Sequence, residues 1–537
     1  MNLRPPRRRL SDMLLLAALA TCSLSAWAVP CSTPGTEQLA PLDDYSQGWG
    51  IDRRNTRFQP KTTINSSNAQ QLKLKWAYGL GSNEPRAYPL VTKNIIYIGS
   101  DGEGLLALDR ETGCERWRHV QTGQFGSAIV PASAAGRPML IFNIRQRGTF
   151  AVDARTGELI WHASVSQAPV PWYSGSPVVV GNTVYVPVSS MEVGLAINPL
   201  YGCCTTSGGF AAFNLTTGEP LWYVPTIDQP ATKTGSHYGL VSEYGPSGAA
   251  VWAAPSYDDV GHRLFFGTGQ NYSHPTTQTS DAIFAVDADN GDILWVNQLT
   301  ANDAYNASCN VISLNHPNCP KPLGPDVDFG AATLLNLGLD GKKRLIAGQK
   351  SAEVHALDPM TGELLWSQRL GRGGIIGGVH WGMASNEQLG LLYVPISDKA
   401  ISGFPSPGDP EPGLFALDSV TGEIRWHHAR PPRCAGEAAC VYGLSAAAIA
   451  ANDIVVVGSI DGYLEILDAR DGHSLWSHDA WRDYPSVNGV SASGGGFDAH
   501  GPMLADDLLL VTSGYFYVGD QRPGNAFLVF QLVDTDE

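Results

Sequence analysis

The stretch Phe150-Ala-Val-Asp-Ala-Arg-Thr-Gly157, followed by Trp161, is one copy of a unit that returns along the whole chain. Apolar residues alternate up to the Asp, which favours a β-strand with one buried face. Asp-x-x-Thr-Gly then forms a tight turn, because Gly157 adopts a positive φ angle at little cost. The following strand carries Trp161, which is large enough to pack against a neighbouring unit. Each copy therefore predicts one β-hairpin.

The unit occurs seven times, and its second half occurs once more near the start of the chain, in Leu72-Lys-Leu-Lys-Trp76. Other short strand runs lie between the hairpins, so that each repeat contains about four strands. Four strands a repeat predict a propeller blade, and eight copies predict an all-β, eight-bladed β-propeller. The last strand, residues 526–530, is expected to pair with N-terminal strands and close the ring. The seven turn glycines are Gly113, Gly157, Gly218, Gly291, Gly362, Gly422 and Gly472, and the other strand runs are residues 94–98, 183–186, 263–266, 391–394, 454–457 and 508–511.

Composition agrees with many short strands joined by turns. The chain has 537 residues, of which only 16% are charged, with 59 glycines and 36 prolines. That length suggests several ordinary domains, but a repeat fold uses it as one domain. The net charge of −16 and the lack of a basic stripe disfavour nucleic-acid binding. No apolar run after the N-terminus approaches the roughly 20 residues of a membrane span.

The N-terminus has the features of a targeting segment. Arginines at positions 4 and 7–9 precede an apolar run, and Ala26-Trp27-Ala28 is a small-x-small cleavage signal. We therefore expect a signal peptide over residues 1–28, cleaved after Ala28, and a single propeller over residues 29–537 in a periplasmic or secreted protein. A lipid on Cys22 is the alternative, although Thr21 fits a lipoprotein signal poorly.

Eight cysteines remain after that cleavage, and an even number in an oxidising compartment suggests disulfides. Sequence does not fix their pairing. Short loops favour the pairs Cys203–Cys204, Cys309–Cys319 and Cys434–Cys440, which leaves Cys31–Cys114. Adjacent cysteines that bond to each other form a strained ring, and strain of that kind is typical of a functional site. Two separate thiols are the alternative.

Long spacings between some hairpins predict inserted loops. They fall at residues 191–210, 270–281 and 304–330, and around Cys434 and Cys440. Insertions in a repeat fold collect on one face, which is often the binding face. The pair Cys203 and Cys204 lies in the first insertion, and Glu192 begins it.

Several longer strings resemble the pyrroloquinoline quinone (PQQ) dehydrogenases, the eight-bladed quinoprotein alcohol dehydrogenases, and among them the polyvinyl-alcohol dehydrogenase branch. The resemblance runs from about Trp49 to the C-terminus. The strings are Trp49-Gly-Ile-Asp-Arg-Arg-Asn-Thr-Arg-Phe58, Tyr201-Gly-Cys-Cys-Thr205, Gly245-Pro-Ser-Gly248 with Trp252, Gly267-Thr-Gly-Gln-Asn-Tyr-Ser273, Gly324-Pro-Asp-Val-Asp-Phe-Gly330, Ala347-Gly-Gln-Lys350 and His380-Trp-Gly-Met383.

The resemblance implies a site for PQQ, a flat polyanionic orthoquinone. In this family a vicinal disulfide covers one face of the quinone and a Trp the other, which match Cys203–Cys204 and Trp252. Lys350 matches the basic residue that hydrogen-bonds the quinone oxygens, where a fixed cation stabilises developing negative charge. His380, Trp381 and Asn488 are weaker candidates for the cofactor site. Core packing is the plain alternative for Trp252, and an exposed strand end for Lys350.

The resemblance also implies Ca²⁺, a hard cation bound by carboxylate and amide oxygens. Glu192 and Asn271 match the family's metal ligands, with Gln270 as the alternative to Asn271 and a solvated carboxylate as the alternative for Glu192. Asp326 matches the base that takes the alcohol proton, and it also belongs to the implied metal ligands. Asp328 is the second candidate for the base and Asp303 the third.

These implications add up to an exported PQQ- and Ca²⁺-dependent alcohol dehydrogenase. Its substrate would be a secondary alcohol, a polyol or polyvinyl alcohol. Electrons would pass to a separate cytochrome c or similar carrier, because the chain contains no Cys-x-x-Cys-His motif for covalent haem. Two alternatives remain: a non-enzymatic propeller of the outer-membrane assembly type, and a family member that has lost PQQ.

Overall fold

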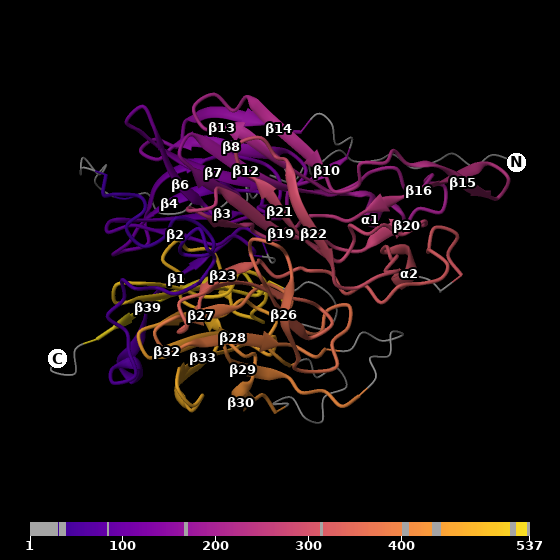
Figure 1. The fold of residues 1–537 in the computed structure, drawn as a ribbon. Coiled ribbons are helices and arrows are strands. Elements are labelled where there is room, and N and C mark those ends of the chain that lie inside the picture. Colours follow the sequence, from indigo (N-terminus) through magenta and orange to yellow (C-terminus); the bar gives the residue numbers. More distant parts are fainter. Residues whose placement is uncertain are drawn as a thin grey trace, which may run out of the picture.

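The computed structural model describes residue 31 and residues 39–82, 85–165, 170–311, 315–399, 408–431, 442–515 and 522–533. Eight antiparallel sheets follow one another along the chain; in seven of them the blade strands pair in sequence order, and the eighth ends on a strand from the start of the chain. They are the blades of an eight-bladed propeller, as the repeats predict (Figure 1). The expected signal peptide of residues 1–28, with Cys22, and the pair Cys434 and Cys440 lie outside the described residues.

The first four blades come from residues 90–298. Their strands are β2 (Leu90–Val91), β3 (Ile95–Ser100), β4 (Gly104–Asp109) and β5 (Glu115–His119); β6 (Val130–Ala134), β7 (Arg137–Ile144), β8 (Gly148–Asp153) and β9 (Leu159–Ala163); β11 (Val178–Val180), β12 (Thr183–Ser190), β13 (Gly209–Asn214) and β14 (Pro220–Pro225), with β10 (Pro171–Trp172) beside β12; and β18 (Ser256–Asp258), β19 (Arg263–Gly267), β21 (Ala282–Asp287) and β22 (Ile293–Gln298).

The last four blades follow the same plan. Their strands are β23 (Leu334–Leu337), β24 (Lys343–Gly348), β25 (Glu353–Leu357) and β26 (Leu364–Arg369); β27 (Ala384–Asn386), β28 (Leu391–Ile396), β29 (Gly413–Asp418) and β30 (Ile424–Ala429); β31 (Ile449–Ala451), β32 (Ile454–Gly458), β33 (Tyr463–Asp468) and β34 (Ser474–Asp479); and β37 (Met503–Ala505), β38 (Leu508–Ser513), β39 (Ala526–Leu532) and β1 (Leu72–Gly79).

The repeated turn joins neighbouring blades as well as neighbouring strands. Gly157 has a φ of 72°, and a Cβ placed on it would lie 2.6 Å from the Trp117 ring of the preceding blade. Glycine is therefore needed there for both its conformation and its lack of a side chain. The other turn glycines meet the preceding tryptophan in the same way, from Gly113 on Trp76 to Gly472 on Trp426. The tryptophans thus pack between blades, as expected.

The ring closes by pairing the two ends of the chain. Strand β1 pairs antiparallel with β39, from Leu72 opposite Leu532 to Gly79 opposite Ala526. The eighth blade thus takes its outer strand from the N-terminal side and its three inner strands from the C-terminal side. This arrangement confirms the expected closure, because it joins the two ends of the chain in one sheet.

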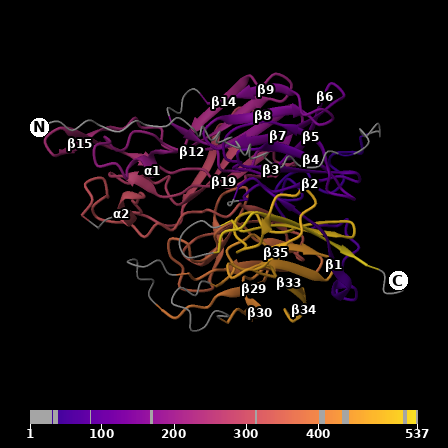
Figure 2. The ribbon, with the colours of Figure 1, turned by 180° about the vertical axis from the view of Figure 1, so that it is seen from behind.

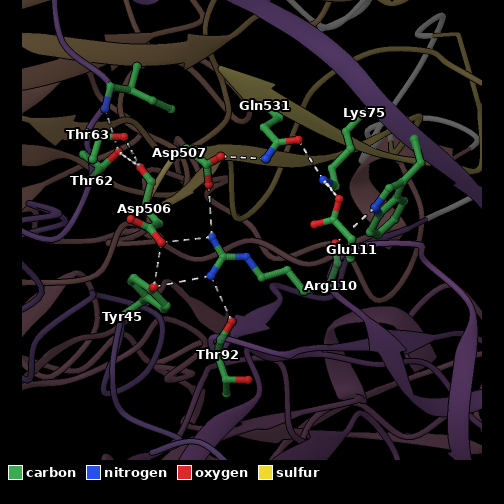
Figure 3. Close-up of polar contacts among 12 residues, drawn as sticks. Tyr45, Thr62, Thr63, Lys75, Thr92, Arg110, Glu111, Asp506, Asp507 and Gln531 are labelled. Carbon is green, nitrogen blue, oxygen red and sulfur yellow. Dashed lines mark hydrogen bonds and ion pairs between the residues drawn. The ribbon is translucent and has the colours of Figure 1, made fainter. Parts of the chain in front are cut away.

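A polar network ties this blade to its neighbour (Figure 3). Arg110 lies 3.4 Å from Asp506 and 3.2 Å from Asp507, and it also donates to the Thr92 carbonyl. Gln531 Nε2 donates to Asp507 over 2.7 Å. One side chain from the first blade thus holds two carboxylates of the eighth.

We expect Arg110→Met to lower the free energy of unfolding by roughly 1–3 kcal/mol, because it removes several charge-assisted hydrogen bonds at once. The measurement is urea unfolding followed by far-UV circular dichroism. Arg425→Met is the matched control, since Arg425 pairs with Asp418 at a more exposed position and should change little. Equal effects of the two substitutions would show that the network does not stabilise the ring.

Residues 53–59 run around one end of the propeller axis and bond to six blades in turn. Their partners are innermost strands or the residues beside them, so the segment crosses the place where the blades converge. The bonds are Arg53 Nε to Val179 O, Tyr257 N to Arg53 O, Leu335 N to Arg54 O, Ser385 N to Thr56 O, Ala450 N to Arg57 O and Gln59 Nε2 to Leu504 O.

The insertions gather on one side of the molecule, away from the pairing of β1 with β39, and both views agree (Figures 1 and 2). They include α1 (Glu192–Leu195), α2 (Ser308–Val311) and β20 (Asn271–Ser273). A hairpin arm of β15 (Thr232–His237) and β16 (Val241–Gly245), with β17 (Ser247–Gly248) after it, is a further insertion that the spacing did not predict. The remaining elements are η1 (Ala69–Gln71), β35 (Asp483–Tyr484) and β36 (Ala492–Ser493). Among the described residues no helix is long and apolar enough to span a bilayer.

Candidate active site

Cys203 and Cys204 are bonded to each other, as predicted, and both are buried. They pack with Ala250, Tyr272 and Trp252 in one apolar cluster. Strand β16 holds their backbone, because Tyr244 N donates to Cys203 O over 2.8 Å and Cys204 N donates to Tyr244 O over 3.3 Å. The vicinal disulfide is therefore fixed at the base of the hairpin arm. Cys31–Cys114 and Cys309–Cys319 are also bonded, as predicted.

Trp252 lies against the backbone at Gly330, where a Cβ would come within 2.1 Å of the indole ring. The indole Nε1 donates to Asp328 Oδ2 over 3.1 Å. The edges of the His380 and Trp381 rings meet Trp252, with centroids at 6.0 and 5.6 Å. Trp252 is thus clamped in one orientation by a glycine, a carboxylate and two rings.

Lys350 lies between two buried carboxylates. Its Nζ is 3.2 Å from Asp326 Oδ1 and 3.0 Å from Asp328 Oδ2, and 5.5 Å from the centroid of the Trp252 ring. All three charged side chains are at most 7% exposed. Burial raises the pKa of Asp326 well above its usual range, against the opposing effect of Lys350. The cluster therefore combines a fixed cation with a carboxylate that holds a proton readily.

The three candidates for the base differ in how their oxygens are used. Asp328 Oδ1 accepts from Gln270 N, and its Oδ2 accepts from Trp252 and Lys350. Asp303 accepts the backbone N–H of Asp326 on Oδ1 and that of Val327 on Oδ2. Asp326 Oδ2 accepts no hydrogen bond from any described residue. Asp326 is the candidate with an oxygen left for a substrate.

Asp303 also supports the conformation of Asp326. Asp326 has a φ of 56°, a left-handed conformation that is unfavourable for a residue with a side chain. The backbone N–H groups of Asp326 and Val327 donate to the Asp303 carboxylate over 3.1 and 2.9 Å, and these two hydrogen bonds stabilise the turn. Burial raises the pKa of Asp303 to about 6. The geometry gives Asp303 a positioning role, although the sequence suggested it only as a third candidate for the base.

Glu192 is completely buried at the start of α1. Its Oε1 accepts from Tyr201 Oη over 2.8 Å, and its Oε2 from the backbone and hydroxyl of Thr206 over 2.7 and 2.6 Å. Thr205 N donates to the same carboxylate. No sequence pattern marks these partners of Glu192, although Tyr201 and Thr205 begin and end the string around the cysteines.

The two candidate amide ligands are placed differently. The amide oxygen of Asn271 accepts from Thr277 N over 2.9 Å, and its Nδ2 donates to Ser247 O. Gln270 donates through Nε2 to Tyr305 O, and its backbone N–H binds Asp328. The side chain of Gln270 thus has the more accessible oxygen of the two.

Backbone hydrogen bonds connect all these segments. Ala307 N donates to Val193 O beside Glu192, Tyr305 N to Asn271 O, and Asn271 N to Asp303 O. The insertion after the fourth blade therefore links α1 to the loop of Asp326. One further acid in this region lies in no recognisable sequence motif. Asp281 is buried with neither carboxylate oxygen hydrogen-bonded, and burial and Asp303 raise its pKa well above its usual range.

Of the three weaker candidates for the cofactor site, Trp381 and His380 lie beside Trp252, and Asn488 lies at the ring closure. Trp381 belongs to the cluster, and its Nε1 donates to Asp498 over 2.5 Å. His380 shares a hydrogen bond with Ser445, and burial lowers the pKa of His380 well below its usual range. Asn488 instead donates to Gly79 O and accepts from Gly79 N, beside the last residue of β1.

Comparisons with known proteins agree with this geometry. Residues 47–311 match the family model of the glucose/ethanol/alcohol dehydrogenase β-propeller domain, named for PQQ. A polyvinylalcohol dehydrogenase from Sphingopyxis sp. strain 113P3 is 32% identical over 498 residues, which cover 91% of this chain and 75% of the relative. The chain belongs to the PQQ-dependent quinoprotein alcohol dehydrogenases. Quinoprotein alcohol dehydrogenase PedH of Pseudomonas putida is a more distant relative, at 22% identity over 88% of each chain.

Solved structures of quinoproteins share the fold. The quinohemoprotein alcohol dehydrogenase ADHIIG from Pseudomonas putida HK5 superposes with a TM-score of 0.65 at 18% identity, covering 91% of this chain and 80% of that one. A europium-containing methanol dehydrogenase gives 0.63 at 17% identity, covering 91% and 99%. Residues 326–492 also match the model of the outer membrane protein assembly factor BamB. That match covers blade repeats, and family membership places this dehydrogenase among the enzymes rather than the assembly scaffolds.

Proposed function

We propose that this dehydrogenase oxidises secondary alcohols or polyols, polyvinyl alcohol among them, with PQQ and Ca²⁺, and passes the electrons to a separate cytochrome c or similar carrier. We further propose that residues 1–28 are an export signal and that residues 29–537 form one propeller in the periplasm or outside the cell. The observation that carries the catalytic proposal is the buried group of Asp326, Lys350 and Asp328 beside Trp252 and the vicinal disulfide.

The residues present suit PQQ. Cys203–Cys204 and Trp252 supply two flat apolar surfaces in one cluster, and Lys350 supplies a buried positive charge beside them. Bound PQQ would supply the acceptor for the hydride from the alcohol carbon. Asp326 takes the hydroxyl proton on Oδ2, the oxygen that no described residue uses, so the alcohol becomes a carbonyl compound. Lys350 would supply a positive charge for the oxygens of the quinone, and Asp328 holds Lys350 and the Trp252 indole in place.

The oxygen atoms of Glu192, Asp326 and one amide have the chemistry that Ca²⁺ prefers. We propose Glu192 and Asp326 as ligands, with Gln270 or Asn271 as the amide. Glu192 has no basic partner among the described ion pairs, and its donors are backbone N–H and hydroxyl groups. A bound cation would balance this buried charge and act as a Lewis acid.

Reconstitution tests the proposal. Mature protein mixed with PQQ and Ca²⁺ should reduce an artificial dye when a secondary alcohol or polyvinyl alcohol is supplied. Glu192→Ala should lose the Ca²⁺-dependent part of this activity, while Glu219→Ala, at an exposed turn, should retain it. Failure of PQQ to bind or to support turnover would refute the enzymatic proposal, and full activity of Glu192→Ala would remove Glu192 from the metal site. A panel of alcohols then ranks the substrates.

A further inference from the structure

The hairpin arm of β15 and β16 extends outward from the vicinal disulfide, on the side where the insertions gather (Figures 1 and 2). Tyr244, near the end of β16, exchanges backbone hydrogen bonds with Cys203 and Cys204, whereas residues 238–240 form the tip. At about 3.3 Å a residue, the strand between the tip and Tyr244 spans roughly 13 Å. A ligand that lies along the arm therefore reaches from open solvent to the disulfide.

The tip of the arm exposes two large side chains, Tyr238 at 66% and Leu240 at 90%. The Tyr238 ring lies edge-on against the His237 ring, with centroids 5.1 Å apart. His237 Nε2 in turn donates to Pro199 O over 2.7 Å, and Leu200, the next residue, is also exposed. The arm and the first insertion thus present large apolar side chains to solvent beside one another.

The backbone conformation at Tyr238 is unfavourable for a residue with a large side chain. Tyr238 has a φ of 52° and Gly239 a φ of 71°, so both are in the left-handed region. Glycine or asparagine adopts that conformation with less strain than tyrosine. Because the ring lies in solvent and not in the core, packing does not explain a tyrosine there, and strain of this kind is typical of a binding site.

Hydroxyl groups line one face of the arm between its tip and the disulfide. Ser236 lies directly opposite Ser242 in the register of the two strands. Opposite residues share a face, as do residues two apart along a strand, so Ser236, Ser242 and Tyr244 lie on the same side. No hydrogen bond among the described residues uses these three hydroxyl groups, which leaves them for a ligand.

The charge of the arm favours a neutral ligand over a protein partner. Lys233 and Glu243 are the two acidic or basic residues besides His237 in residues 232–245. Glu243 already shares a hydrogen bond of 3.1 Å with His237. Docking of a protein such as an electron carrier depends on complementary charge. A surface of hydroxyl groups and exposed apolar side chains instead matches a hydrocarbon chain that carries hydroxyl groups.

We propose that the arm is a subsite for a long hydroxylated hydrocarbon chain, which it holds while one alcohol group of that chain lies in the active site. This inference rests on the proposed oxidation of polyvinyl alcohol, and it names the surface that favours the polymer over a small alcohol. Tyr238 and Leu240 contact the hydrocarbon backbone. Ser236, Ser242 and Tyr244 exchange hydrogen bonds with the hydroxyl groups of successive repeat units.

Kinetics with polyvinyl alcohol and with pentane-2,4-diol test the proposal, because the diol has the same 1,3-diol unit but is too short to reach the tip. The protein is loaded with PQQ and Ca²⁺ and assayed with an artificial dye. The double variant Tyr238→Ser/Leu240→Ser should raise KM for the polymer at least about tenfold, since it loses both apolar contacts. Its kcat and its KM for the diol should stay within about twofold of the wild type.

Two further variants control for the loss of large exposed side chains. Tyr238→Phe/Leu240→Met keeps the apolar surface of the tip, so its KM for the polymer should match that of the wild type. Leu339→Ser changes an exposed leucine at a turn of the fifth blade and should affect neither substrate. An equal rise of KM for polymer and diol in the double variant would overturn the proposal.

Binding of fluorescein-labelled polyvinyl alcohol to the cofactor-free protein, followed by fluorescence anisotropy, tests the proposal without turnover. The double variant should bind the polymer at least about tenfold more weakly than the wild type. Equal binding by both proteins, or binding by neither, overturns the proposal. If the wild type binds the polymer through the arm but oxidises neither polymer nor diol, the proposed function is overturned instead. Slower reduction of cytochrome c by the double variant, with KM for the polymer unchanged, would assign the arm to the electron carrier and refute the subsite.

Tyr238→Gly separates binding from folding. Glycine relieves the left-handed strain, so the Tm of the cofactor-free protein should not fall. KM for the polymer should still rise, because the aromatic surface is lost. A lowered Tm with an unchanged KM would show that the ring serves only the fold, against the proposal.

Discussion

Asp326→Asn is expected to lower kcat by roughly 10²–10⁴-fold, which is the usual contribution of a positioned general base. Asparagine keeps the size of the side chain but cannot take a proton from the alcohol. The wild-type rate should fall at low pH, because the raised pKa of Asp326 leaves its carboxylate protonated there. The substitution should abolish that acid limb. Steady-state kinetics at saturating PQQ and Ca²⁺, over a range of pH, measure both effects.

Asp328→Asn is the matched comparison, since it changes a neighbouring carboxylate of the same cluster. Asp328 holds Trp252 and Lys350, so its substitution should weaken PQQ binding as well as turnover. Asp326 also pairs with Lys350, so Asp326→Asn should weaken PQQ binding too, but less than Asp328→Asn, because the contact of Asp328 with Trp252 stays in place. A variant Asp326→Asn that keeps its rate and its acid limb, with the limb lost in Asp328→Asn, would move the role of base to Asp328.

Asp303→Ala is expected to lower kcat by about 10²-fold, the cost of displacing a catalytic group by about 1 Å. The substitution removes the acceptor of two buried N–H groups under the left-handed turn of Asp326. Asp303→Asn keeps one acceptor oxygen, so it should lose less. Steady-state kinetics of both variants measure the loss, with KM expected to stay close to the wild-type value.

The pH profile separates positioning from proton transfer. With Asp326 still present, Asp303→Ala should retain an acid limb, although it should shift because the neighbouring charge is gone. Loss of the limb in Asp303→Ala, and its persistence in Asp326→Asn, would make Asp303 the base. Asp289→Ala, at an exposed turn of the fourth blade, controls for removal of a carboxylate outside the site.

The sequence predicts the blades well because each hairpin contains a short sequence motif that determines its structure locally. Asp, Thr and Gly specify the turn within a few residues. The tryptophan supplies the surface on which the turn of the next blade packs. The arm of β15 and β16 contains no such motif. Its strands are mostly polar and only Gly245 among them is buried, so neither an alternating pattern nor a repeat marks them.

The residues of the site can be predicted from the sequence only where they lie in a short, recognisable string. The strings around Cys203, Trp252 and Lys350 led to residues that the fold brings together. The partners of Asp303 are 23 and 24 residues distant along the chain, through an insertion whose path no local pattern reveals. The placement of Gln270 against Asn271 depends on a single step of register in a three-residue strand.

The segment of residues 53–59 has a consequence for the order in which the protein assembles. It is synthesised before every blade, yet its partners extend as far along the chain as Leu504. Such bonds between distant parts of the chain form late, since the intervening residues must first be brought into place. The final position of the segment therefore depends on completion of the ring. It reaches its final position only once the blades it touches stand around the axis, and a chain that stops short of the last blade leaves it without its final partner.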